Sequence, residues 1–472
     1  MSNYTIQSST LNKNRVFILQ KSELEKRFDP QFYKQEYKDN LEKIKRINHK
    51  RLGEAVKFST ETWNQKDFFE STFPYIEISE IDTISGEIQN IVQVEKEKAA
   101  SRAKMIVREN DIIISTTRPN RGAISLIRKE QDFSIASTGF SVIRNITNPE
   151  IDREYLFTIL RQQLILKQFE QRSSGGNYPA ITQEELGSVT FPLPEKEIQK
   201  KIVQVFNSCF AQKQKNEAEA DKLLSSIDDY LLSELGIKLP ELPENTLKNR
   251  MFTRKFSDIV NKRIDPFFHQ DKFLNNLSAI SNGKYPVKKL QEIISGNLIK
   301  GSLPKQDEKD GGCSVVQINS INADGTISLD DLLTAKNIFS KQQKLNLGDV
   351  LVVITGATIG KIAFWNYEGD YFLGGDIVKF QTDSSFDKGF VFNFLRCSLM
   401  QIEIKKNITG ATNGHLAPGD ISHLPIPVPP LVKQKEIAEH ITGIRQQAQQ
   451  LKDKTNEALK KVSDEIEKIL LN

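Results

Sequence analysis

The last stretch of the chain, residues 427–472, carries apolar side chains at steps of four and three. The positions are Ile437, Ile441, Ile444, Ala448, Leu451, Ala458, Val462, Ile466 and Ile469. This is the spacing of a heptad seam, with Thr455 in its one polar slot. No Pro or Gly follows Gly443, so we predict one helix roughly 45–55 Å long. Its narrow apolar stripe has to be buried, which requires a partner helix.

A second heptad pattern begins after Pro192-Leu193-Pro194 and predicts that partner helix. Its apolar residues are Ile198, Ile202, Val205, Phe206, Cys209, Ala220, Leu224, Ile227, Leu231 and Leu235. Gly236, Pro240 and Pro243 predict the helix end. The polar run from Gln212 to Glu219 weakens the seam in the middle of this helix.

The pattern of the first half of the chain returns in the second half, at offsets of 235 to 240 residues. The matching stretches are Arg27–Phe32 with Arg263–Phe268, Tyr75–Ile78 with Val315–Ile318, Asn110–Ile114 with Gly348–Val352, and Pro192–Ile202 with Pro427–Ile437. Gly86 and Gly325 mark turns, and Gly122 and Gly360 mark tight returns after buried strands. A shorter helix is predicted from Tyr155 to Leu166 and again from Phe390 to Met400, with Arg161 matching Arg396.

This repetition predicts an α+β fold with two tandem duplicated globular domains, each followed by a long helix, the two helices pairing as an antiparallel coiled coil. The expected boundaries are 1–190 for the first domain and 191–245 for the central helix and linker. They are 246–426 for the second domain and 427–472 for the C-terminal helix.

Composition narrows the class of protein. The chain has 472 residues, 38% hydrophobic and 27% charged, which is typical of a globular protein of several domains. No signal peptide or membrane-spanning run is visible, and three scattered cysteines indicate a reducing compartment, so we expect a cytoplasmic protein with no membrane association. A formal net charge of +4 permits an anionic partner without requiring one.

Two stretches resemble catalytic or cofactor motifs. Gly356–Lys361 resembles a phosphate-binding loop but is one residue short and is followed by Ile362, so a β-turn with a basic tip is favoured. Asp29-Pro30-Gln31-Phe32 resembles the Asp-Pro-Pro-Tyr loop of amino-methyltransferases, but a helix start with Asp29 as N-cap is favoured. No paired carboxylate, serine, cysteine or histidine spacing predicts a catalytic or metal site.

Turn-forming loops behind the buried strands are the better candidates for a binding surface. They combine guanidinium, amide, hydroxyl and aromatic groups that can contact phosphates and base edges, although each alone is equally compatible with an ordinary solvated turn. The candidate residues are Arg118, Asn120, Arg121, Ser174, Asn177, Tyr178, Thr355, Thr358, Lys361, Thr412, Asn413 and His415.

With two globular domains and two Pro-x-Pro helices, the chain resembles the specificity subunit of a type I restriction–modification enzyme over essentially its whole length. The most specific marks are Pro192-Leu193-Pro194 with Gln199-Lys200-Lys201-Ile202, and Pro427-Val428-Pro429-Pro430 with Gln434-Lys435-Glu436-Ile437. The resemblance implies that each domain recognises half of a bipartite site in double-stranded DNA. It also implies that the helices bind two methyltransferase subunits, on which restriction subunits dock.

By the same resemblance the chain has no catalytic centre or cofactor of its own, and S-adenosylmethionine, ATP and magnesium belong to partner subunits. The residues expected to pair the helices or bind subunits are Ile198, Ile202, Leu224, Ile227, Leu231, Ile437, Ile441, Ile444, Leu451, Val462 and Ile466. Two alternatives stay open at this point: a coiled-coil scaffold that binds only proteins, and a methyltransferase or nuclease with a divergent centre.

Overall fold

The structure is a computed structural model that describes residues 19, 21, 24–25, 27–64, 69, 71–241, 246, 251–259, 263–330, 332–336, 338–410 and 414–471. The chain forms two compact units. Unit 1 comprises residues 1–217 and 453–472, and unit 2 comprises residues 218–452. Each unit therefore contains one globular domain together with part of both long helices.

Two four-stranded sheets form the centre of unit 1. The first has the order β2 (Val56–Ser59), β9 (Phe140–Ile146), β6 (Ile112–Ser115) and β7 (Ile124–Leu126), all antiparallel. The second has the order β4 (Val92–Glu95), β3 (Thr72–Ile76), β8 (Ile135–Ser137) and β5 (Ala103–Ile106), in which β3 and β8 are parallel. A third, two-stranded sheet pairs β1 (His49–Arg51) with β10 (Thr190–Pro192). Strand β6 is buried on both faces, which explains its run of consecutive isoleucines.

The globular part of unit 1 also contains the α-helices α1 (Gln35–Lys45), α2 (Leu52–Ala55), α3 (Arg153–Leu160), α4 (Gln163–Arg172) and α5 (Gln183–Gly187). The expectation of one helix from Tyr155 to Leu166 is wrong, because Gln162 has an extended backbone with φ −79° and ψ 152°. The break lets α3 pack on β7 while α4 packs on α1. Apolar periodicity continues through both helices and so does not reveal it.

Unit 2 repeats this arrangement. Its sheets are β12 (Ile294–Lys300), β18 (Ile377–Thr382), β15 (Val350–Val353) and β16 (Ile362–Phe364); β14 (Leu333–Ala335), β13 (Lys309–Val316) and β17 (Tyr371–Leu373); and β11 (Val287–Lys289) with β19 (Pro425–Pro427). Its shorter helices are α8 (Phe256–Ile259), α9 (Asp271–Ser281), α10 (Lys388–Arg396), α11 (Ser398–Asn407) and α12 (Pro418–Ser422). The predicted helix from Phe390 to Met400 is also two helices, separated by the extended Cys397. The order of the four-stranded sheet that contains β6 or β15 and the position of this break agree between the units, which confirms the duplication. The second sheet differs, because among the described residues it has four strands in unit 1 and three in unit 2.

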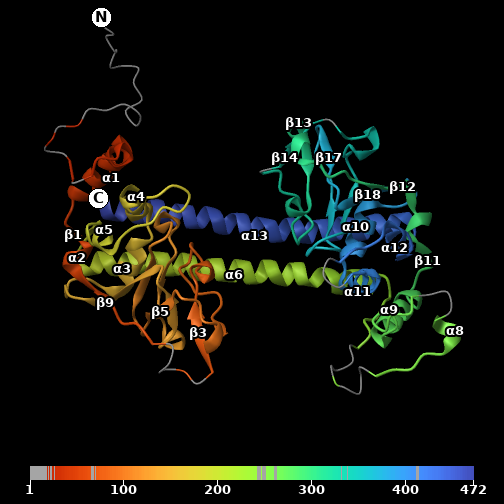
Figure 1. Ribbon diagram of the computed structural model, residues 1–472, viewed down its shortest axis with the longest axis horizontal. Helices are drawn as coiled ribbons and strands as arrows, with labels where there is room; N and C mark the ends of the chain where they lie inside the picture. The colour runs from red at the N-terminus through yellow and green to blue at the C-terminus, as the bar shows by residue number, and fades with distance from the viewer. Residues whose placement is uncertain are drawn as a thin grey trace, which may run out of the picture. The chain divides into compact units, whose positions relative to one another are not determined.

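The two long helices are α6 (Lys196–Glu234) and α13 (Leu431–Leu471), each continuous between these bounds (Figure 1). Each follows a short strand that ends in the first proline of its Pro-x-Pro sequence, Pro192 or Pro427. Helix α6 ends near Gly236, whose φ of +64° is the left-handed conformation that terminates helices. Within the described ranges, no helix is long and apolar enough to cross a membrane.

The helices run antiparallel within each unit. In unit 1, Ile202 and Phe206 of α6 share a core with Ile466 and Leu470 of α13. In unit 2, Ile227 and Leu231 of α6 share a core with the α13 isoleucines at 437, 441 and 444.

Thr455, the polar residue in the seam of α13, faces a polar residue of α6, because Asn216 Nδ2 donates to Thr455 Oγ1 at 3.1 Å. The other predicted pairing residues, Ile198, Leu224, Leu451 and Val462, are half-buried. The predicted antiparallel pairing is thus confirmed inside each unit.

One buried glutamine ties each long helix to its domain. Gln199 Oε1 accepts from the Asp152 backbone N–H at 2.9 Å, and its Nε2 donates to the Pro194 carbonyl at 2.8 Å. In unit 2, Gln434 makes the same two bonds, with the Asp387 N–H at 2.9 Å and the Pro429 carbonyl at 2.8 Å. The glutamine that marks both helix entrances in the sequence therefore joins the first turn of the long helix to the start of α3 or α10.

Candidate nucleic-acid interface

A loop with an unusual backbone follows strand β6. Arg118 has φ +49° and ψ +50°, a left-handed conformation that costs a non-glycine residue about 1–3 kcal/mol. The next three residues, Pro119–Arg121, form a 3₁₀ turn that closes at Gly122, where φ is +78°. The turn buries Pro119 and leaves Asn120 and Arg121 exposed. The fold thus directs an amide and a guanidinium outward from a rigid base.

The second candidate loop of unit 1 lies against the first. Ser174 and Thr117 both form β-bridges to Ala180, which closes the loop from 174 to 180. The Arg118 guanidinium lies 4.4 Å from the centre of the Tyr178 ring, and its Nη2 donates to the Asn177 carbonyl at 2.8 Å. The Tyr178 side chain is 71% exposed, and Ser174 and Asn177 are exposed as well.

The structure therefore brings together all six residues proposed for the first half of the chain, although Arg118 and Tyr178 are 60 positions apart. Together they present an aromatic ring, two amides, a hydroxyl and two guanidiniums. Such groups can donate to and accept from base edges and bind phosphates. Their proximity was not predicted, because a β-bridge between two loops leaves no periodic signal in the sequence.

Unit 2 repeats the frame of these loops with different side chains. His415 bridges both Thr355 and Thr409, as Ala180 bridges Thr117 and Ser174 in unit 1. Thr355 Oγ1 donates to Asp376, and Lys361 Nζ donates to the Ile321 carbonyl at 3.1 Å.

The β-turn expected at 356–361 is present, but the expected basic tip is not, because the Lys361 ammonium is held against the backbone. The Thr358 hydroxyl is buried and has no hydrogen-bond partner among the described residues. His415 is half-buried, and Thr412 and Asn413 lie outside the described residues. The unit 2 tips are thus less charged than those of unit 1.

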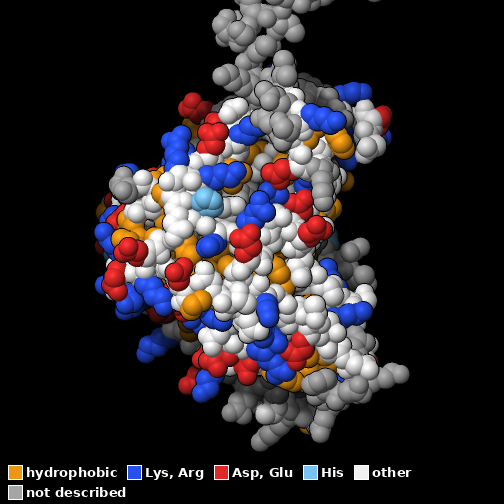
Figure 2. All heavy atoms as spheres, turned by 90° about the vertical axis from the view of Figure 1, so that its left-hand side faces the viewer, with side chains coloured by type: hydrophobic (Ala, Val, Ile, Leu, Met, Phe, Trp, Pro, Cys, Tyr) orange, Lys and Arg blue, Asp and Glu red, His pale blue; other side chains and the backbone are white. Residues whose placement is uncertain are grey.

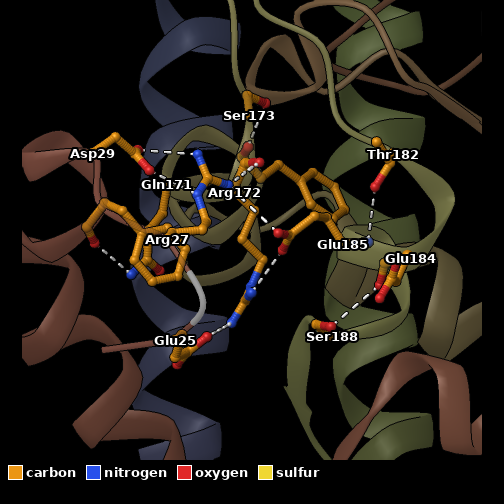
Figure 3. Close-up of polar contacts among 12 residues, drawn as sticks. Glu25, Arg27, Asp29, Gln171, Arg172, Ser173, Thr182, Glu184, Glu185 and Ser188 are labelled. Atoms are coloured by element: carbon orange, nitrogen blue, oxygen red, sulfur yellow. Dashed lines mark hydrogen bonds and ion pairs between the residues drawn. The ribbon is translucent and has the colours of Figure 1, made fainter. Parts of the chain in front are cut away.

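The repeated Arg-x-Asp-Pro segment lies at the base of the loop that starts at Ser173 (Figure 3). Arg27 makes a two-point ion pair with Asp29, at 2.9 and 3.0 Å, and its Nη1 donates to the Arg172 carbonyl at 2.9 Å. Glu185 accepts from Arg172 at 2.8 Å and lies 3.6 Å from Arg27. The hydrogen bond from Arg27 to Asp29 is the main cause that raises the pKa of the Arg27 guanidinium.

Asp29 occupies the N-cap position of the 3₁₀ turn Pro30–Tyr33 but makes no capping bond there, so the N-cap prediction is only partly right. In unit 2, Asp265 does cap, accepting from the Phe268 N–H at 3.0 Å, and Arg263 donates to the Lys406 carbonyl at 3.4 Å. In both units the segment fixes the C-terminal end of the helix that precedes a candidate loop. Its role in the structure is to position that loop.

Buried carboxylates at the start of the central strands are paired with cations. Asp111 is 1% exposed and binds Arg144 at 2.9 Å, and burial is the main cause that raises the pKa of Asp111. Asp349 pairs with Lys379 at 2.8 Å in the equivalent place. Among the described residues, no group of three or more His, Cys, Asp or Glu side chains could hold a metal ion.

Figure 2 shows the face that lies on the left-hand side of Figure 1. On this face Lys and Arg side chains are interspersed with Asp and Glu side chains. No single sign of charge dominates this face. Binding of a polyanion through this face alone would gain little from electrostatics, since attraction and repulsion would largely offset each other.

Comparison with known proteins agrees with the duplicated architecture. The family model described as the type I restriction modification DNA specificity domain matches twice, over residues 42–225 and 282–461. The MjaVIII specificity subunit of Methanocaldococcus jannaschii is 24% identical over 378 residues, which covers 78% of this chain and 80% of that protein.

Two further relatives match over shorter regions. The HindI specificity subunit of Haemophilus influenzae is 28% identical over 147 residues, which covers 30% of this chain. The EcoKI specificity subunit of Escherichia coli is 24% identical over 170 residues, which covers 35% of this chain. The matched regions span 28% and 37% of these two relatives' own lengths.

A solved chain from a study of complex assembly and conformational transition in the type I R-M system has the same fold. It superposes with a TM-score of 0.50 at 21% identity, over 90% of this chain and 96% of the other.

Proposed function

This chain belongs to the type I restriction modification DNA specificity family, and we propose that it reads a bipartite target in double-stranded DNA, with one half-site for each unit. The observation that carries the proposal is the repeated pair of bridged loops. The frame at Thr117, Ser174 and Ala180 returns at Thr355, Thr409 and His415 with different side chains. A constant frame with variable tips is what two readers of different half-sites need.

We further propose that the chain has no catalytic activity, and that methyl transfer and cleavage are performed by partner subunits. Support comes from the buried carboxylates Asp111 and Asp349, which are each committed to an ion pair. The turn at 356–361 directs its lysine to a backbone carbonyl, which argues against phosphate binding there. S-adenosylmethionine, ATP and magnesium would accordingly be bound by those partners.

The partners we propose are two methyltransferase subunits and, docked on them, restriction subunits. The antiparallel helices supply a surface for this, because their apolar stripes are covered by each other and their flanks are polar and exposed. The scaffold alternative shares this feature but gives no reason for the exposed Asn120 and Arg121 on a strained loop and the exposed Tyr178 on the loop bridged to it. A protein that acts on DNA inside the cell would be cytoplasmic, and that location is part of the proposal.

The experiment that tests the proposed function maps methylated bases in DNA modified by this chain together with a type I methyltransferase subunit that co-purifies with it. The expected result is methylation within a site of two short specific sequences separated by an unread spacer of fixed length. Methylation within one uninterrupted sequence, or methyl transfer by the chain alone, would contradict it.

A further inference from the structure

Unit 2 contains a cavity of about 470 Å³ beside the long helices, within the size range of small-molecule sites, roughly 300–1,000 Å³. One wall is apolar and comes from Leu224 and Ile227 of α6 and Ala448 of α13. Three cations also line the cavity, Arg396 from α10 and Arg445 and Lys452 from α13. None of the candidate loop residues lines this cavity.

The two arginines are held in place by neutral groups. Their guanidinium carbons lie 5.3 Å (Arg396) and 5.2 Å (Arg445) from the centre of the Phe392 ring. Arg396 Nη2 donates to the Ala323 carbonyl at 3.1 Å, and Arg445 Nη2 donates to Asn393 Oδ1 at 2.8 Å. Within the described part of the chain neither guanidinium has an ion-pair partner within 4.0 Å. A guanidinium has five N–H donors, so each retains donors beyond this single bond.

Two carboxylates also line the cavity. Asp324 attracts both guanidiniums and Asp228 attracts Arg396, but neither lies within 4.0 Å of them, and each accepts hydrogen bonds from other residues. Asp324 accepts from the Thr326 N–H at 2.9 Å and from the Thr326 hydroxyl at 2.6 Å. Asp228 accepts from the Ser398 N–H at 2.7 Å, at the start of α11. Three cations against two carboxylates leave the cavity with a formal excess of one positive charge.

The duplication shows that this excess is particular to unit 2. Arg161 in unit 1 is the counterpart of Arg396, but Arg445, Ala448 and Lys452 correspond to Phe210, Lys213 and Glu217. In unit 1, Lys213 is neutralised by Glu217 at 2.8 Å and Asp82 at 3.6 Å, and Phe210 stacks on Phe206. Unit 2 therefore replaces a lysine side chain by the methyl group of Ala448 and replaces an aromatic ring and a carboxylate by cations.

Burial disfavours the charged form of both guanidiniums, and at Arg445 the neighbouring positive charge adds to this effect. Burial, together with the nearby Arg396, lowers the pKa of Arg445 to about 10, and burial lowers the pKa of Arg396 as well. An anion placed between the two guanidiniums would relieve their repulsion and use their remaining donors. An apolar portion of the same ligand would cover the wall formed by Leu224, Ile227 and Ala448.

We propose that this cavity binds a small organic anion, with a carboxylate, sulfonate or phosphate group on Arg396 and Arg445 and an apolar body against Leu224, Ile227 and Ala448. The proposal is independent of DNA reading, since every residue that carries it lies outside the candidate loops. It concerns a free small molecule, because the volume is of small-molecule size and residues of three helices, α6, α10 and α13, line it.

The test uses the full-length chain and two fluorescent probes of similar shape. 8-Anilinonaphthalene-1-sulfonate carries an anionic group, and N-phenyl-1-naphthylamine does not. We expect the sulfonate to bind at one saturable site and at least fivefold more tightly than the neutral probe. Arg445→Met should weaken sulfonate binding more than fivefold and neutral-probe binding less than fivefold, because only the anionic contact is lost.

Ala448→Phe fills the cavity and should weaken both probes more than fivefold, whereas Lys460→Met, at an exposed site on the same helix, should weaken neither. Thermal unfolding curves establish that each variant folds. If Arg445→Met does not fold, two other measurements test the proposal: the affinities of the two probes for the unmodified chain, and the effect of Ala448→Phe on both affinities. Equal binding of the two probes, or sulfonate binding altered less than fivefold by a folded Arg445→Met or Ala448→Phe variant, would overturn the proposal.

Discussion

At the scale of single residues, Gln199 and Gln434 explain why the two helix entrances have the same sequence signature. Each side chain is almost fully buried and connects two backbone groups that would otherwise be unpaired. A buried donor or acceptor without a partner costs about 1–3 kcal/mol. An apolar side chain of the same size would leave both backbone groups unpaired, so the fold is more stable with an amide at this position. The orientation of the helix relative to its own domain follows from these bonds.

Gln434→Leu is therefore expected to destabilise unit 2 by about 2–3 kcal/mol, because the Asp387 N–H and the Pro429 carbonyl lose their partner. Urea unfolding can be followed in a Trp63→Phe background, where the buried Trp365 is the only remaining tryptophan and reports on unit 2. Lys435→Leu, at the exposed neighbouring position, is the matched control and should change stability by less than about 0.5 kcal/mol. Equal stability of the two variants would show that the amide bonds do not hold the helix.

The side chains of the candidate loops show where sequence reasoning stops. The loops themselves could be predicted, because each follows a buried strand and contains turn-forming residues. The direction of their side chains could not, because it depends on partners far away in sequence. Arg118 lies over Tyr178, whereas Lys361 turns inward to Ile321, although both were expected at the tips.

At the scale of elements, the apolar stripe of α13 is divided between two cores. Its isoleucines at 437 and 441 are fully buried in unit 2, and Ile466 is fully buried in unit 1. Periodicity predicted these helices and the buried strands well, because burial on one face imposes a regular spacing. It missed the breaks at Gln162 and Cys397, where apolar residues continue while the backbone becomes extended.

Ile441→Asp should place a carboxylate in the seam of unit 2 and destabilise that unit by several kcal/mol. The same substitution at Val432, which is 80% exposed on the same helix, is the control and should have little effect. Thermal unfolding measures the stability, and co-purification with a methyltransferase subunit measures assembly. Assembly and stability that are unchanged in Ile441→Asp would contradict a role for the paired helices in holding the complex.

At the scale of the whole molecule, each unit is built on parts of both long helices. Lengthening α6 alone would therefore shift its seam against α13 and disturb pairing. Four residues inserted after Glu217 and four more after Lys452 add about one turn to each helix and nearly preserve both stripes. The added length is roughly 6 Å, and one base pair rises about 3.4 Å.

We predict that the matched pair of insertions lengthens the unread spacer of the target by one or two base pairs and leaves both half-site sequences unchanged. The insertion in α6 alone is the control and should reduce stability, as measured by thermal unfolding, together with DNA recognition. An active matched variant with the original spacer would show that the helices do not set the spacing.

The most direct test of the central claim is whether the two units read their half-sites independently. Sequences would be selected from a pool of random duplexes by the unmodified chain, by Asn120→Ala/Arg121→Ala in unit 1 and by His415→Ala in unit 2, each with its methyltransferase subunit. A contact to a base edge contributes about 1–3 kcal/mol, so each variant should relax or change one half-site and leave the other half-site and the spacer intact. Both half-sites changing together in either folded variant, or neither changing in both variants, would contradict the account.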